Sequence, residues 1–207
     1  PGSGPIGVVE KLIPYLPVPM VDKKEDGTYF WNSDYPNSIG RLHGYFGNFG
    51  VLVRAYVYIK MLGESGLKEM TRNAILNANY LKHRLKDHYD VPYSDGIMHE
   101  FVISGVKQKK RGMKVLDIAK GILDEGFHSP TIYFPMNVPE AMMIEPTETE
   151  SKTTLDDFAD ALIKLDKMID ENPQALRDAP ITTPVERLNE AQASRNPDVR
   201  WEFETSD

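Results

Sequence analysis

The segment TLDDFADALIKLDKMIDENP, residues 154–173, most constrains what this 207-residue chain can fold into. Its apolar residues recur every three or four positions, the period of an amphipathic α-helix that buries one face. We expect Thr154 to cap this helix, with Asp157 three positions on completing a capping box. The helix needs a core to pack against, so the fold has to supply one. Its apolar face carries Leu155, Phe158, Ala159, Leu162 and Ile169.

Helical and strand patterns alternate along the rest of the chain. The stretch PIGVVEKLIPYLP predicts a short strand near the N-terminus, and residues 21–50 predict an irregular loop rich in glycine, asparagine and aromatic residues. The tail from Ala179 predicts surface turns and one short helix. Further helices are expected over residues 48–62, stopped by Gly63 and Gly66, over 67–88 and over 114–126. Further strands are expected in HEFVIS, TIYFP and AMMIEP.

Charge and cysteine content exclude several classes of protein. The chain has 24 basic and 31 acidic side chains, a net charge of −7, which argues against nucleic acid and anionic membranes as partners. There is no cysteine, so disulfides and thiolate catalysis are excluded and a reducing cytoplasm is favoured. The most apolar run, residues 49–62, is too short to span a membrane and contains Arg54. We therefore expect a soluble cytoplasmic protein.

The first seven residues contain G-x-G-x-x-G, formed by Gly2, Gly4 and Gly7. In a dinucleotide-binding fold this loop follows a strand and opens a helix, whose N-terminus faces the pyrophosphate. Here the glycines precede a strand-like segment, and Pro5 lies inside the motif. We expect a glycine-rich turn of another fold instead.

Few polar residues suggest chemistry on their own. The five histidines, at 43, 83, 88, 99 and 128, show no i, i+4 pair, so no helical metal site is expected. His83 and His88 are expected to be solvated, whereas His128 stands in a loop before a predicted strand, where site residues are common. The residues alone leave two roles for His128, a structural one and one in a functional site.

Charged residues give three further expectations. Arg54 on an apolar helix needs a carboxylate or an anionic ligand as partner. The basic stretch VKQKKRGMK, residues 106–114, is expected to be a solvated loop. The carboxylates of Glu145, Glu148 and Glu150 could act as acid and base or bind a hard cation. As structure, they are a strand end leading into the helix at 154, which is the interpretation that the residues alone favour.

Several stretches resemble one family, the glycine decarboxylase P-proteins, in the form of subunit 2 of the two-subunit bacterial enzyme. The resemblance extends from residue 1 to about residue 201, and GFHSPT followed by IEPTE is its most specific part. The similar stretches are PGSGPIGV, YPNSIGRLHGYFGNFGVLVRAYVYIKMLGESGL, HEFVIS, GFHSPTIYFP, MMIEPTETES and TPVERLNEAQASRNPDVRW.

The resemblance implies the fold. It is an α/β fold, the C-terminal part of an aspartate-aminotransferase-like (fold type I) transferase that depends on pyridoxal 5'-phosphate (PLP). Residues 1–66 would be a remnant of the large PLP-binding domain, residues 67–178 a small α+β domain, and residues 179–207 a tail. The lysine that forms the Schiff base with PLP would lie upstream, so the chain is expected to be a fragment that contains no catalytic residue, binds no PLP and is inactive alone.

The resemblance also implies a function for the intact protein, decarboxylation of glycine in the glycine cleavage system. The aminomethyl group would pass to the lipoyl arm of the H-protein, and subunit 1 would complete a hetero-oligomer. The candidate cleft residues are Ser38, Arg41, Asn48, His128 and Thr131, with no metal. The alternative is a non-catalytic interaction or oligomerisation module.

Overall fold

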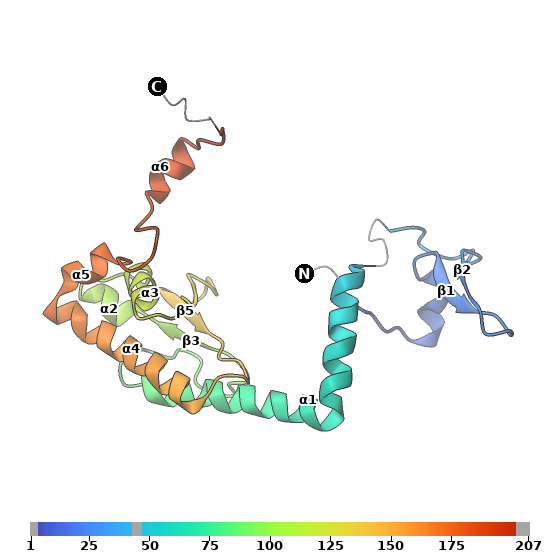
Figure 1. Cartoon of the computed structure of the whole chain (residues 1–207), viewed down its shortest axis with the longest axis horizontal. Helices are drawn as coiled ribbons and strands as arrows, with labels where there is room; N and C mark the ends of the chain where they lie inside the picture. Colours follow the sequence, from blue (N-terminus) through green and yellow to red (C-terminus); the bar gives the residue numbers. More distant parts are fainter. Residues whose placement is uncertain (1–3, 43–46, 202–207) are drawn as a thin grey trace. The chain divides into compact units, whose positions relative to one another are not determined.

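The computed structural model describes residues 4–42 and 47–201 (Figure 1). Two of the residues discussed above, Gly2 and His43, lie outside these ranges. The chain divides into two compact units, Pro1–Leu67 and Lys68–Asp207. Within the described ranges, no helix combines the length and hydropathy that a membrane span requires.

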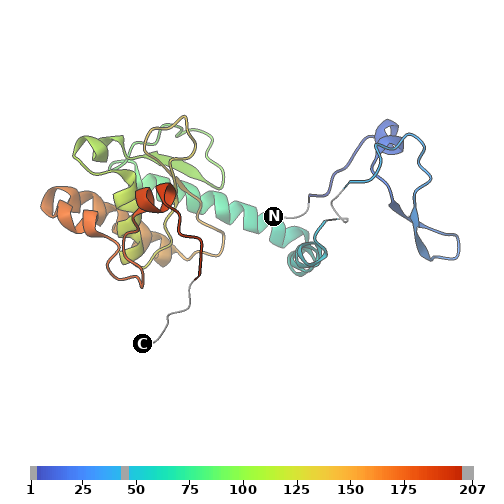
Figure 2. The same ribbon diagram turned by 90° about the horizontal axis from the view of Figure 1, so that it is seen from above.

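The first unit contains a 3-10 helix and a β-hairpin. The 3-10 helix η1 spans Glu10–Tyr15, and β1 (Met20–Lys23) pairs antiparallel with β2 (Tyr29–Asn32). Figure 2 shows the hairpin as a two-stranded ribbon. Gly27, with φ of 88°, lies in its turn, where glycine adopts positive φ without strain.

Two expectations for this unit were wrong. The described residues before η1 form no strand, because no neighbouring strand pairs with them. The region expected to be an irregular loop contains the hairpin instead. Its second strand carries the aromatic run Tyr29, Phe30 and Trp31, a residue type that strands favour.

The helix α1 spans Phe49–Leu85 and is interrupted at Gly63, which has φ of 62° and ψ of −172°. That conformation is essentially restricted to glycine, so the predicted stop at Gly63 is confirmed. The other predicted stop, Gly66, stays helical, because glycine inside a helix costs only about 1 kcal/mol. The boundary between the two units falls within α1.

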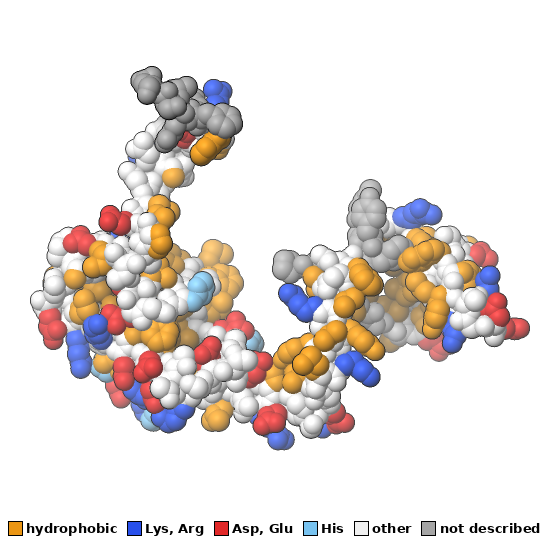
Figure 3. Space-filling view, in the orientation of Figure 1, with side chains coloured by type: hydrophobic (Ala, Val, Ile, Leu, Met, Phe, Trp, Pro, Cys, Tyr) orange, Lys and Arg blue, Asp and Glu red, His pale blue; other side chains and the backbone are white. Residues whose placement is uncertain are grey.

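The first piece of α1 exposes apolar side chains on several sides, seen as orange atoms in Figure 3. Arg54 lies on this piece, is exposed, and forms no ion pair with the described residues, so the predicted carboxylate partner is not found among them. The exposed apolar residues of the piece are Phe49, Leu52, Val53, Tyr56, Val57, Tyr58, Ile59 and Met61.

The second unit contains a three-stranded antiparallel sheet in the order β3-β5-β4. Its strands are β3 (Phe101–Ser104), β4 (Thr131–Ile132) and β5 (Ala141–Ile144), so all three predicted strands are confirmed. In the register, Ile103 lies opposite Met142 on one side of β5. On the other side, Thr131 lies opposite Met143.

Helices pack around this sheet and enclose the core. They are α2 (Val106–Lys110), α3 (Val115–Asp124), α4 (Lys152–Glu171) and α5 (Pro173–Asp178). The helix α6 (Glu190–Arg195) belongs to the tail and buries no residue. The second piece of α1, α3 and α4 supply most of the helical core residues, including Leu81, Ile118 and Leu162, each at most 1% exposed. The predicted amphipathic helices at 114–126 and 154–173 and the short helix of the tail are confirmed.

The predicted cap of α4 was wrong. The N-cap is Ser151, whose Oγ accepts a hydrogen bond from the backbone N–H of Thr154 at 3.1 Å. The helix therefore begins at Lys152, and Thr154 lies inside its first turn. Both Ser151 and Thr154 are residue types that cap helices well, so local sequence does not distinguish the two positions.

Candidate functional site

The loop between α3 and β4 carries His128 and is held at both ends. At its start, Gly126 follows α3 two positions after the last helical residue and has φ of 84°. The N–H of Gly126 donates to the carbonyl of Leu123 at 3.0 Å, and that of Phe127 donates to Ile122 at 3.2 Å. A left-handed glycine at this position is a common way to end a helix. At the other end of the loop, Thr131 joins the sheet through its pairing with Met143.

This loop forms one wall of a cavity of about 450 Å³ in the second unit. His128 and Thr131, both predicted as cleft residues, line it, so the structure brings these two together. Helices α1 and α4 and strand β5 provide the other walls. The lining residues are Leu81, Gly126, Phe127, His128, Ser129, Pro130, Thr131, Met143, Ile144, Glu145, Pro146, Glu150, Thr154, Leu155 and Phe158.

The cavity combines apolar and acidic surface. Leu81, Leu155 and Phe158 contribute apolar side chains, while the lining contains neither lysine nor arginine. The carboxylates of Glu145 and Glu150 both belong to the lining, and Glu145 Oε1 lies 3.8 Å from His99 Nε2. Negative charge without a basic neighbour in the lining disfavours an anionic group inside this cavity.

The other three predicted cleft residues belong to the first unit, where each has a local environment of its own. Ser38 Oγ donates to the carbonyl of Leu16 at 2.6 Å and accepts from the N–H of Gly40 at 3.0 Å. Asn48 Oδ1 accepts from the N–H of Val51 at 3.3 Å, which satisfies a donor in the first turn of α1. Arg41 is exposed.

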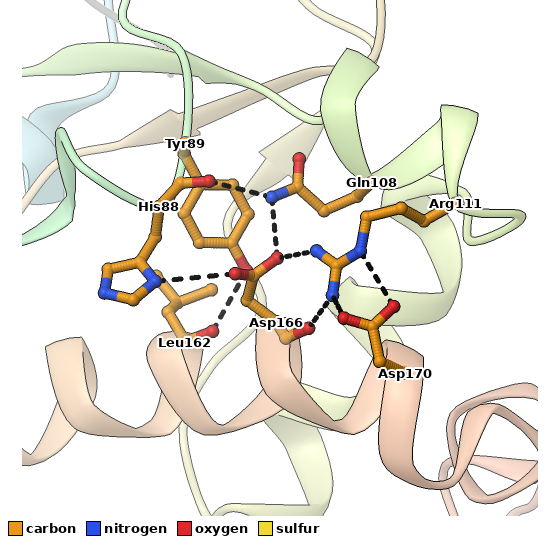
Figure 4. Close-up of polar contacts among 7 residues, drawn as sticks. All are labelled: His88, Tyr89, Gln108, Arg111, Leu162, Asp166 and Asp170. Carbon is orange, nitrogen blue, oxygen red and sulfur yellow. Dashed lines mark hydrogen bonds and ion pairs between the residues drawn. The ribbon is translucent and has the colours of Figure 1, made fainter.

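A second polar cluster centres on Asp166 of α4 (Figure 4). Its Oδ1 accepts from Gln108 Nε2 at 2.8 Å and from Arg111 Nη1 at 2.6 Å. Its Oδ2 lies 3.4 Å from His88 Nδ1. Arg111 also binds both carboxylate oxygens of Asp170. The cluster ties α2 and the segment after α1 to α4.

Two expectations are corrected by this cluster. The basic stretch at 106–114 is not a solvated loop, because it contains the helix α2 with the fully buried Gln108. His88 is not simply solvated, because its side chain is 30% exposed and faces Asp166. In both cases the partner carboxylates lie more than fifty residues away in sequence, so local composition could not reveal them.

The sequence did not identify the cavity residues that come from distant elements. Phe158 and Leu155 were expected only as apolar positions of a helix. The glutamates were considered as acid and base or as cation ligands, but the strand end was the favoured interpretation. Glu145 and Glu150 nevertheless line the same cavity as His128. One signal could have placed these glutamates near His128. The two segments that most specifically resemble the family, GFHSPT and IEPTE, each lie next to a predicted strand of one small sheet.

Comparisons with known proteins agree with this arrangement. Residues 70–184 match the model of a family described as glycine dehydrogenase, C-terminal domain. The chain is 56% identical over 202 residues to the probable glycine dehydrogenase (decarboxylating) subunit 2 of Bacillus licheniformis, covering 98% of this chain and 41% of that protein. The protein of the same name from Chloroherpeton thalassium is 53% identical over 204 residues, with 97% and 41% covered. The chain thus spans about two fifths of the length of these relatives.

A solved structure gives independent support for the fold. It is a crystal structure of a glycine decarboxylase (P-protein) of the glycine cleavage system in inhibitor-bound form, with a TM-score of 0.54 and 15% sequence identity. The match covers 70% of this chain and 34% of that one. It confirms the expected fold class, the C-terminal part of a fold type I enzyme. Because the family model matches more than half of the chain, the chain belongs to the family described as glycine dehydrogenase, C-terminal domain.

Proposed function

We propose that this chain is the C-terminal part of a PLP-dependent glycine decarboxylase of the glycine cleavage system. The observation that carries the proposal is the cavity in the matched domain, where His128 and Thr131 lie together. The identity of more than half to proteins named glycine dehydrogenase (decarboxylating) subunit 2 supports the choice of glycine as substrate. The same identity disfavours a stand-alone, non-catalytic module.

The cavity does not fit the PLP phosphate. A phosphate is favoured by cationic side chains, whereas the described lining residues include Glu145 and Glu150 and no lysine or arginine. We therefore assign the cavity a place beside the cofactor, as a wall of the substrate cleft. When bound elsewhere in the intact enzyme, PLP would supply the electron sink for loss of CO₂.

Within this proposal, the chain's own residues bind and orient. The His128 imidazole can donate and accept hydrogen bonds through its two ring nitrogens, and the Thr131 hydroxyl can donate one hydrogen bond and accept others. Ser38, Arg41 and Asn48 remain proposed cleft residues, of which Arg41 is the cationic group suited to a carboxylate. The proposed location is the cytoplasm, in keeping with the absence of cysteine.

The proposed partners are subunit 1 and a lipoylated H-protein. The exposed apolar side chains on the first piece of α1, including Leu52, Tyr56 and Ile59, support a hetero-oligomer. Apolar side chains on several sides of a helix are normally buried, so a covering surface is expected for this piece, which also carries the exposed Arg54.

A chimera tests the proposal. The 202 aligned residues of the Bacillus licheniformis subunit 2 are replaced by those of this chain, and glycine–bicarbonate carboxyl exchange is measured with PLP, subunit 1 and a lipoylated H-protein. We expect exchange that depends on all components. The matched pair His128→Gln and His83→Gln separates the site from the surface, because only the first should reduce exchange, by about 100-fold. A folded, PLP-loaded chimera without exchange would contradict glycine decarboxylation.

A further inference from the structure

Among the residues that the structure describes, His128 has no polar partner that orients it. The imidazole is at the exposed edge of the cavity and forms no hydrogen bond or ion pair with the residues that the structure describes. Most histidines with a chemical role are oriented by a hydrogen bond to the second ring nitrogen. For His128 the orientation must therefore come from the backbone of its own loop and from the packing of the neighbouring residues.

The residue before it, Phe127, is fixed in two ways. Its N–H donates to the carbonyl of Ile122 at 3.2 Å, which ties the backbone to the end of α3. Its ring packs edge-on against the ring of Phe158, with centroids 5.4 Å apart and an interplanar angle of 78°. Both rings also line the cavity beside His128. An edge-to-face pair of this geometry stabilises more than the burial of area alone.

The alternative supports for the loop are weaker. Gly126 lacks a side chain, and a Cβ built at this position meets no atom within 4 Å. Ser129 Oγ donates only to the carbonyl of the next residue, at 3.3 Å. The ion pair between Glu125 and Lys164 joins the residue just after α3 to α4. Beyond Gly126, the aromatic pair provides a side-chain contact between the loop and α4.

We propose that Phe158, acting through Phe127, is a positioning residue that holds the His128 imidazole at the cavity. The role of His128 in the reaction rests on the proposed function. The claim that Phe158 holds His128 in place does not depend on it. Without the ring of Phe158, the loop can rotate about Gly126, and His128 samples several positions.

The first test uses the isolated 207-residue chain and needs no activity. In Phe158→Leu, we expect amide hydrogen exchange at Phe127 to accelerate by about two- to tenfold, the range that an aromatic pair supports. The NMR signals of the His128 ring should shift or broaden. Phe158→Tyr keeps the ring and should restore both properties. Met168→Leu is the matched control, another half-buried apolar side chain of α4, which does not line the cavity.

Each result either supports or overturns the positioning role of Phe158. The proposal would be overturned if both Phe158→Leu and Phe127→Leu left amide hydrogen exchange at residue 127 and the NMR signals of the His128 ring unchanged. Equal changes in Met168→Leu would also overturn it. In the chimera, Phe158→Leu should lower kcat of carboxyl exchange with little change in KM for glycine, and Phe158→Tyr should recover it. If the unmutated chimera shows no carboxyl exchange, the proposed function fails. The NMR signals and the amide hydrogen exchange of the isolated chain still decide the positioning role.

Discussion

The carboxylate of Glu140 accepts a hydrogen bond from the backbone N–H of Val115 at 3.0 Å, across 25 positions of sequence. Val115 is the first residue of α3, so a side chain from the loop before β5 satisfies one of the free donors of that helix. The other carboxylate oxygen lies 2.6 Å from Lys109 Nζ. Glu140 has φ of 49°, an unfavourable conformation for glutamate, and these two contacts hold it there.

Removing this cap should destabilise the chain. We expect Glu140→Ala to lower the free energy of unfolding by about 1–2 kcal/mol, because it leaves the N–H of Val115 without its acceptor. Urea unfolding followed by circular dichroism measures the change. Glu125→Ala, which breaks only the exposed ion pair with Lys164, should cost at most about 0.5 kcal/mol. Equal effects of the two variants would argue against the cap.

Asp124 makes stability depend on pH. Burial alone would raise the pKa of its carboxyl, but hydrogen bonds from Thr182 and Ile181 outweigh burial and lower the pKa below its ordinary value of 3.8. The folded state therefore binds the proton less tightly than the unfolded state. The stabilisation from Asp124 is complete above pH 3.8 and is lost as the pH falls through the lower folded value.

The difference in unfolding free energy between the wild-type chain and Asp124→Asn should accordingly shrink on acidification. Urea unfolding at a series of pH values from neutral to about 3 measures it. Asp157→Asn, on the exposed side of α4, serves as control and should show little difference at any pH. A difference for Asp124→Asn that grows toward low pH would contradict the sign.

Gly121 should resist replacement by alanine. Alanine normally stabilises a helix interior by about 1 kcal/mol relative to glycine. Here the added Cβ would lie 2.8 Å from Leu165 Cδ2 and 3.2 Å from Leu176 Cδ2, and both leucines are buried. We expect Gly121→Ala to lower the free energy of unfolding by about 1–3 kcal/mol. Lys120→Ala on the same helix should stay within about 0.5 kcal/mol, and a stabilised Gly121→Ala would show that the contact relaxes freely.

Arg187 fixes the start of the tail to the second unit. Its guanidinium donates to Asp117 Oδ1 at 2.6 Å and to the carbonyls of Ala179 at 3.0 Å and Leu176 at 3.2 Å. In Asp117→Asn, trypsin should cleave after Arg187 faster than in the wild-type chain, because a local opening becomes easier. Cleavage after the exposed Arg195 provides the internal reference and should not change. Mass spectrometry of the early fragments distinguishes the two sites.

Local pattern was enough for most elements of the second unit, but not for α2, which was expected to be a loop. The apolar period of α4, the alternation around Phe101 and Ile103, and the glycine at the end of α3 each depend on neighbours within a few residues. The same reasoning failed at the N-terminus, where the described residues before η1 have no paired strand. A strand requires a partner, which the sequence of one segment cannot supply.

The sequence by itself determined the family, the three strands of the second unit with the helices α3 and α4, and two of the cavity residues, His128 and Thr131. Only the tertiary structure decided that Phe158 packs on Phe127, that Asp166 is shared by Gln108 and Arg111, and that Glu140 caps α3. The physical reason is the separation in sequence over which each kind of interaction acts. Periodicity and turn preferences act over a few residues, whereas caps, ion pairs and cavity walls join groups that chain folding brings together from distant positions.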